Sequence, residues 1–315
     1  MFTKSRAAAL LIAAALYPAS AAFAQNGDSG QGRAIVTVLG KNTEATPAVT
    51  QQDVKVQVAG KFATVTGWAP LTGQQSKLEL VLLIDDSART SLSRQFDELG
   101  QFLKSLPPDT AAGVAYMING RAAFSGPLTT DHAQLIKEIH ITAGAPGENA
   151  SPYFCLSDLA KRWPSNDRTA RREVLMLTDG VDNYERRFDP DDPYVQAAIT
   201  DSIRSGLVVY SIYWRDSGRF DRTNYGNDTG QNLLSLVTAA TGGNDYWEGT
   251  GNPVSFQPFL EDLSRRLQNQ YELGVTAKIG QKPQVETMKL KISAPAIKVT
   301  APQQVFIAPG GGAQQ

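Results

Sequence analysis

Two short apolar runs in the middle of the chain each end abruptly in a carboxylate. Residues 79–85 read Glu-Leu-Val-Leu-Leu-Ile-Asp, and residues 173–179 read Glu-Val-Leu-Met-Leu-Thr-Asp. An apolar run of this length between helical patterns indicates a strand that is buried on both faces of a parallel sheet. Ligands bind at the carboxyl ends of such strands in open α/β sheets, so Asp85 and Asp179 are candidates for one shared site.

The pattern between 76 and 270 alternates strands with helices. A helix is expected over about 90–104, where apolar residues form one stripe, and Asn119-Gly120 marks a hairpin between strands at 112–118 and 121–124. A further apolar strand follows at 207–213. This order predicts a mostly parallel central sheet with one antiparallel edge strand and helices on both faces.

Both ends of the mature chain instead alternate apolar and polar residues with a period of two, which is typical of strands. Each β segment is small for an independent fold, so we expect the two to pair into one β subdomain with the α/β domain inserted between them. The expected organisation is a signal peptide (1–24), a disordered linker (25–33), an N-terminal β segment (34–75), the α/β domain (76–270), a C-terminal β segment (271–308) and a tail (309–315).

The N-terminus has the features of a secretory signal peptide. Lys4 and Arg6 precede the apolar run 7–16, and Ala22-Phe23-Ala24 provides a small-residue cleavage site. The sequence therefore predicts an exported protein, periplasmic or secreted. No other stretch is apolar and long enough for a membrane span after cleavage.

Composition excludes several function classes. The chain has 30 basic and 31 acidic residues, a balance that gives no electrostatic reason to expect a nucleic-acid partner. It contains no Gly-x-Ser-x-Gly elbow, phosphate-binding loop or His-Glu-x-x-His motif, which argues against an enzyme. A less favoured alternative is an envelope hydrolase that uses Asp85 and Asp179 as an acid/base pair.

The chain resembles a von Willebrand factor A (vWA) domain in the Asp85-x-Ser87 turn, in Leu177-Thr-Asp-Gly180 and in the order of its elements. It is similar over nearly all its mature length to exported bacterial, Acidobacteria-type vWA-related proteins. Further landmarks of that group are Val36-Thr-Val, Val49-Thr-Gln-Gln-Asp-Val-Lys-Val, Thr241-Gly-Gly and Gln270-Tyr-Glu-Leu-Gly. The resemblance implies a Rossmann-like fold with a metal-ion-dependent adhesion site, where an acidic residue of a partner completes the coordination of a divalent cation.

The resemblance implies Asp85, Ser87 and Asp179 as metal ligands, with Ser151 as the nearest candidate for the family's threonine ligand. The implied ion is Mg²⁺, or Mn²⁺ or Ca²⁺, because all these donors are oxygen atoms.

The sequence departs from the family pattern at Arg89, which stands where the family has a second serine. One alternative is a weak metal site, which the negative charge of Asp86 favours. The other is a degenerate site without metal, in which Arg89 and backbone N–H groups satisfy the carboxylates. Asp182, in the loop after Asp179, is expected to modify the site or contact a partner.

Together these observations predict a non-enzymatic, protein-binding module for adhesion or scaffolding, with a partly degenerate adhesion site. The alternative is a structural or assembly component of an envelope complex that holds no metal and uses its β subdomain as the contact surface.

Overall fold

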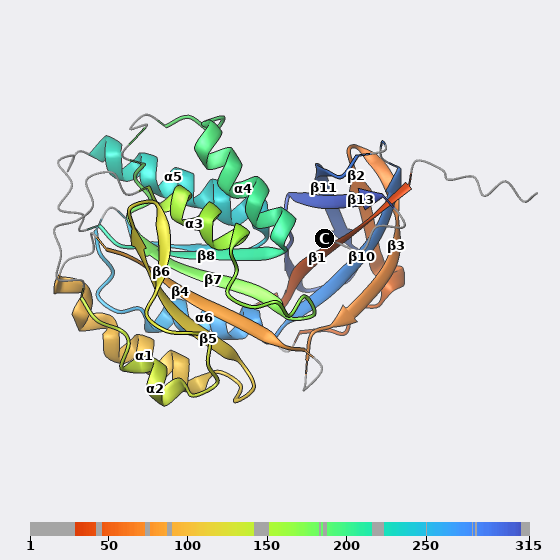
Figure 1. Ribbon diagram of the computed structural model, residues 1–315. Coiled ribbons are helices and arrows are strands. Elements are labelled where there is room, and N and C mark those ends of the chain that lie inside the picture. Colours follow the sequence, from red (N-terminus) through yellow and green to blue (C-terminus); the bar gives the residue numbers. More distant parts are fainter. Residues whose placement is uncertain are drawn as a thin grey trace, which may run out of the picture.

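The structure is a computed structural model that describes residues 29–41, 46–72, 76–86, 90–141, 151–182, 184, 188–215, 224–249, 251–278, 280 and 282–309. These residues form an α/β domain beside a β barrel (Figure 1). The expected signal peptide lies outside the described residues, as do Ser87, Arg89 and almost all of the expected tail.

A sheet of six described strands, in the order β6-β5-β4-β7-β8-β9, forms the centre of the α/β domain. Neighbouring strands are parallel except at one edge, where β6 runs antiparallel to β5. The prediction of a mostly parallel sheet with one antiparallel edge strand is therefore confirmed. The strands are β4 (Leu78–Asp85), β5 (Ala111–Ile118), β6 (Arg121–Phe124), β7 (Arg171–Thr178), β8 (Leu207–Tyr213) and β9 (Asp245–Tyr246).

Helices cover both faces of this sheet, which explains why every residue of β4 is buried (Figure 1). Leu80, Leu82 and Ile84 pack into one core layer, and Val81 and Leu83 pack into the other, as the alternation of side chains along a strand requires. One layer holds η3 (Thr90–Gln95), α1 (Phe96–Ser105), α2 (His132–Ile136) and α6 (Gln257–Leu267). The other holds α3 (Pro152–Lys161), α4 (Pro193–Ser205) and α5 (Asn224–Thr241).

The strands from the two chain ends pair with each other in an all-antiparallel arrangement. Six of them close into a barrel in the order β10-β3-β2-β11-β13-β1, because β1 also pairs with β10, and β12 lies beside β1. The strands are β1 (Ser29–Gly40), β2 (Val54–Val58), β3 (Lys61–Pro70), β10 (Gln270–Lys278), β11 (Gln284–Ile292), β12 (Ile297–Thr300) and β13 (Gln304–Pro309), and η2 (Gln51–Asp53) precedes β2.

The closed barrel corrects the predicted fold class. A Rossmann-like description applies only to the α/β domain, since the β subdomain is a barrel of its own with a separate core. Period-two patterns predict strands but not which strands meet, so closure is not visible in the sequence. Closure leaves no long unpaired strand edge within the six barrel strands.

Residues 29–33 were expected to lie in a disordered linker, and that prediction is wrong. They belong to β1 and pair with residues 274–278 of β10. Glycine has a packing role here, because a Cβ atom on Gly32 would lie 2.5 Å from Cδ1 of Ile307 and 2.8 Å from the carbonyl oxygen of Phe306. The small residues that suggest disorder instead allow β13 to approach β1 closely.

The barrel lies against the amino-terminal ends of the parallel strands, so their carboxyl ends point away from it (Figure 1). The candidate site is therefore at the far end of the α/β domain from the barrel. Among the described residues, no helix has the length and apolar character needed to cross a membrane.

Candidate functional site

The two strand-end carboxylates lie on neighbouring strands. Asp85 is the last residue of β4, Asp179 directly follows β7, and the parallel register pairs Ile84 with Leu177. Each carboxylate residue is only 3% exposed. The sequence therefore predicts correctly that both residues end adjacent buried strands at one edge of the sheet.

A threonine hydroxyl links the ends of these two strands. Thr178 Oγ1 donates to Asp85 Oδ2 at 2.6 Å and accepts from the backbone N–H of Gly180 at 3.1 Å. A charge-assisted hydrogen bond of this kind offsets part of the cost of burying a carboxylate. Thr178 thus holds Asp85 in place from the neighbouring strand. The sequence pattern did not predict this role.

Asp179 is positioned by a tight turn packed against α5. Its Oδ1 accepts from the backbone N–H of Val181 at 3.0 Å. Gly180 has φ +69°, and a Cβ atom there would lie 2.5 Å from the carbonyl oxygen of Gly230. Only glycine fits both the left-handed conformation and this close approach.

The charge of Asp179 also influences Tyr213 at the end of β8. Burial first, and then the charge of Asp179, raise the pKa of Tyr213 above its usual value, while the charge of Arg215 opposes them. The phenol therefore stays neutral at physiological pH, and this strand end lies within electrostatic reach of the candidate site.

Ser151 and Asp182 form a second buried pair. Ser151 Oγ donates to Asp182 Oδ2 at 3.0 Å, and the backbone N–H of Tyr184 donates to Asp182 Oδ1 at 2.8 Å. Nearby, the Tyr153 hydroxyl donates to the carbonyl oxygen of Gly180 at 2.7 Å. Asp182 is 1% exposed, so its side chain fixes the loop after β7 and does not face a partner.

Of the remaining predicted site residues, Asp86 is half-buried directly after β4. Ser87 and Arg89 lie outside the described residues, so the choice between a cation and the Arg89 guanidinium stays a prediction.

The described residues do not fit a divalent cation by themselves. No group of three or more His, Cys, Asp or Glu residues in the described part of the chain could hold a metal ion. Asp85 Oδ2 accepts from Thr178, and Ser151 donates to Asp182, although the resemblance implied this serine as a ligand. In the described geometry, hydroxyl and amide donors bond to Asp85 Oδ2, to Asp179 Oδ1 and to both carboxylate oxygens of Asp182.

Exposed apolar side chains surround this edge, and sequence reasoning missed them. Among the described residues, six of the seven large exposed hydrophobic side chains belong to strand ends, loops or a first helical turn at the carboxyl edge. Val254 belongs here because its carbonyl accepts from Gln95, at the end of η3. The six are Ile118, Tyr184, Phe188, Tyr194, Trp247 and Val254.

Three of the aromatic rings near the site form one cluster. Phe154 packs against Tyr184 with ring centroids 5.0 Å apart and against Tyr194 at 4.8 Å. Tyr184 is 54% exposed and Tyr194 is 47% exposed. Periodicity identifies buried positions, whereas an aromatic residue in an acidic loop carries no periodic signal, so this cluster is visible only in the structure.

We compared the chain with known families, curated proteins and solved structures. No family model matches the chain, and no curated protein matches it. Similar solved structures include BatB from Bacteroides thetaiotaomicron, at 14% identity over 60% of this chain and 97% of that chain, with a TM-score of 0.44. The SpRpn10 VWA domain is 11% identical over 61% of this chain and 97% of that chain, with a TM-score of 0.42. The ArnB paralog VWA2 from Sulfolobus acidocaldarius is 9% identical over 88% of this chain and 75% of that chain, with a TM-score of 0.39.

The strand order decides the assignment. The α/β domain is a vWA-like domain. All three TM-scores are below 0.5. The assignment therefore rests on the observed sheet, with one antiparallel edge strand and with Asp85 and Asp179 at adjacent strand ends. The vWA-like fold establishes neither a metal nor a partner for this chain.

Proposed function

We propose that this protein is an exported, non-enzymatic module that binds another protein through the carboxyl edge of its vWA-like sheet. The observation that carries the proposal is the concentration of exposed aromatic side chains on this edge. Aromatic residues are enriched at the centres of protein interfaces, because they bury a large area and lose few rotamers.

In this proposal the buried carboxylate of Asp182 holds the loop that carries part of the binding surface. Tyr184 follows Asp182 closely in the chain, and the Asp182–Ser151 pair ties its backbone to the start of α3. Phe154 on α3 and Tyr194 on α4 complete the aromatic cluster. A surface held on three elements is pre-organised, which lowers the entropy cost of binding.

We further propose that partner binding does not require a divalent cation. This is supported by the hydrogen bond from Thr178 to Asp85 and by that from Ser151 to Asp182, which use donor and acceptor groups that an adhesion site would direct at a metal. A weak site completed by Ser87 is the competing possibility, and chelation distinguishes the two.

The positions of the two histidines in the chain support the proposal that the protein is not an enzyme. His132 is buried, with Nε2 2.8 Å from the carbonyl oxygen of Thr110, just before β5 and therefore at the opposite edge of the sheet from Asp85. The His140 ring contacts Tyr116, a residue in the interior of β5. Neither histidine contacts Asp85 or Asp179, so no Ser-His-Asp arrangement is supported at this edge.

A second candidate function is an assembly component that uses the barrel. Phe62 on β3 is 79% exposed, and it lines a hollow with Gln51, Val54, Lys55, Val56 and Val65. This is the remaining large exposed hydrophobic side chain in the described part of the chain, and it lies far from the vWA-like edge in sequence and fold.

One capture experiment tests both proposals. The purified protein, the double variant Tyr184→Ala/Tyr194→Ala and the matched barrel variant Phe62→Ala are each incubated with the native envelope fraction, with and without EDTA. We expect a protein captured by the wild type and by Phe62→Ala, lost with the double variant and unaffected by EDTA. Loss with Phe62→Ala alone would favour the assembly function, and loss with EDTA would restore the metal-dependent site.

A further inference from the structure

A buried polar cluster lies at the interface between the vWA-like domain and the barrel, which we call the seam. Arg171 and Glu173 lie at the start of β7 on the same face, because side chains two apart along a strand point the same way. Gln270 is the first residue of the barrel strand β10, and Tyr210 lies on β8. Glu173, Gln270 and Tyr210 are all fully buried.

One guanidinium joins the two domains in this cluster. Arg171 Nη1 donates to Gln270 Oε1 at 2.6 Å, and Gln270 Nε2 donates to the Tyr210 hydroxyl at 3.2 Å. The chain of bonds therefore runs from β7 across the seam to β10 and back to β8. Gln270 depends on Arg171 for the donor that satisfies its buried carbonyl oxygen.

Glu173 interacts electrostatically with the same guanidinium. Neither oxygen of its carboxyl group makes a well-formed hydrogen bond with the described part of the chain. Burial raises the pKa of Glu173 to about 7, and the charge of Arg171, followed by Gln270 and Tyr210, opposes this rise. Glu173 thus changes charge close to neutrality, next to a cation that is bonded to the other domain.

Other charged and titratable groups around the cluster act on its members. Asp109 before β5 acts on Arg171, whose pKa burial lowers and the charges of Glu173, Tyr210 and Asp109 raise. Burial, Glu173 and Tyr246 raise the pKa of Tyr210, while Arg266 on α6 opposes them, so Tyr210 stays neutral. Thr37 on β1 also opposes the rise in the pKa of Tyr210.

We propose that Glu173, Arg171 and Gln270 form a proton-operated latch between the vWA-like domain and the barrel. With Glu173 neutral, Arg171 bonds to Gln270 and the latch is closed. When Glu173 loses its proton, the carboxylate attracts the guanidinium more strongly than a neutral amide does. Arg171 then bonds to Glu173 on its own strand, and Gln270 loses its donor. The packing between the two domains loosens at the start of β10.

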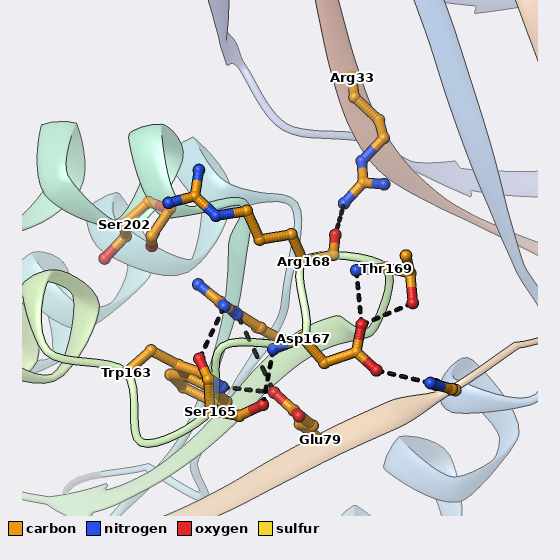
Figure 2. A network of polar contacts seen from close by, with 11 residues as sticks. Arg33, Glu79, Trp163, Ser165, Asp167, Arg168, Thr169 and Ser202 are labelled. Carbon is orange, nitrogen blue, oxygen red and sulfur yellow. Dashed lines mark hydrogen bonds and ion pairs between the residues drawn. The ribbon is translucent and has the colours of Figure 1, made fainter. Parts of the chain in front are cut away.

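Other contacts keep the domains together when the latch opens. Arg33 on β1 donates to the carbonyl oxygen of Arg168 at 3.3 Å, within the polar network at this end of the sheet (Figure 2). Arg266 Nη1 donates to Thr300 Oγ1 at 3.1 Å, and the backbone N–H of Gln303 donates to Ala239 at 3.3 Å. The proposal therefore predicts local loosening of β10 and β1, without separation of the domains.

The network in Figure 2 also supplies a matched control. Glu79 is a buried carboxylate on β4 near the same end of the sheet, and its Oε2 accepts from Trp163 Nε1 at 2.6 Å. Arg172 lies 4.0 Å from it. All three residues belong to the vWA-like domain, so substitution of Glu79 removes a buried carboxylate without touching the latch.

Hydrogen exchange of the purified protein tests the latch. Protection factors for the peptides that cover β1 and the start of β10, corrected for intrinsic exchange, are compared at pH 5.5 and pH 8.5. We expect wild-type protection of these peptides to fall at least about tenfold as the pH rises, the equivalent of one pKa unit of coupling. Glu173→Gln is expected to keep high protection at both pH values, and Glu79→Gln to retain the wild-type fall.

Gln270→Ala provides a second test that does not depend on Glu173→Gln folding. It removes the acceptor across the seam, so protection at the start of β10 is expected to be low and independent of pH. No pH-dependent fall in the wild type would overturn the proposal, as would an equal fall in Glu173→Gln or in Gln270→Ala.

Discussion

Thr178 on β7 donates a hydrogen bond of 2.6 Å to the buried carboxylate of Asp85 on β4, and it thereby joins the ends of the two central strands. In the described part of the chain, this bond fixes the position of the Asp85 carboxylate from the neighbouring strand.

The first prediction concerns this bond. Thr178→Val keeps the shape of the side chain but leaves a buried carboxylate without one donor, which is expected to cost about 1–3 kcal/mol of unfolding free energy. Urea denaturation measures the loss. Thr178→Ser keeps the hydroxyl and is the control, and equal destabilisation by both variants would mean that the bond contributes little.

The second prediction concerns the turn that positions Asp179. Gly180→Ala forces a non-glycine residue to φ +69° and puts a Cβ atom 2.5 Å from the carbonyl oxygen of Gly230. Gly206 ends α4 at φ +70° with nothing within 4 Å of a built Cβ atom, so Gly206→Ala isolates the cost of the conformation. We expect about 1–2 kcal/mol for Gly206→Ala and a clearly larger loss for Gly180→Ala in thermal unfolding. Equal losses would contradict the close approach.

The third prediction concerns pH. Burial raises the pKa of Glu173 in the folded protein to about 7, above its ordinary value of 4.5. Between these values the unfolded chain has lost its proton while the folded protein still holds it. The contribution of Glu173 to the free energy of unfolding is therefore fully present below about pH 4.5 and is lost as the pH rises towards 7.

Denaturation of the wild type and of Glu173→Gln at several pH values across this range gives the free energy of unfolding of each protein. The change with pH in the difference between the two measures the contribution of Glu173. We expect wild-type stability to fall relative to the variant by about 1–3 kcal/mol over the window. Parallel curves would show that Glu173 titrates normally.

The fourth prediction concerns metal. Calorimetric titration of Mg²⁺ or Mn²⁺ into the purified protein is expected to give at best weak binding. Two of the implied metal ligands already take part in hydrogen bonds, Asp85 with Thr178 and Ser151 with Asp182. Micromolar affinity that disappears in Asp179→Ala would contradict this account and restore a working adhesion site.

The buried strands of the vWA-like domain could be predicted from the sequence, because residues 80–84 and 174–177 are uninterrupted apolar runs and both faces of the sheet are covered. The ends of these runs locate Asp85 and Asp179 at once. Barrel closure could not be predicted, because it depends on pairing between β1 and β10, more than 200 residues apart.

Other features depend on tertiary contacts that local composition does not report. Gly30 and Gly32 look disordered in sequence, but Gly32 is required by the close approach of β13. Asp182 is expected from the sequence to modify the site or contact a partner, yet it is buried and bonds to Ser151, 31 positions away. The clustering of Tyr184 and Tyr194 likewise depends on tertiary contacts, because both rings pack against Phe154 on α3.

Site-specific photocrosslinking tests directly whether the carboxyl edge of the vWA-like sheet binds the partner. A photoreactive phenylalanine analogue replaces Tyr184 in one variant and Phe62 in another, and each protein is irradiated in the native envelope with and without EDTA. We expect a discrete crosslinked protein at position 184, present with or without EDTA, and none at position 62. Crosslinks only at position 62, or crosslinks at 184 that vanish on chelation, would contradict it.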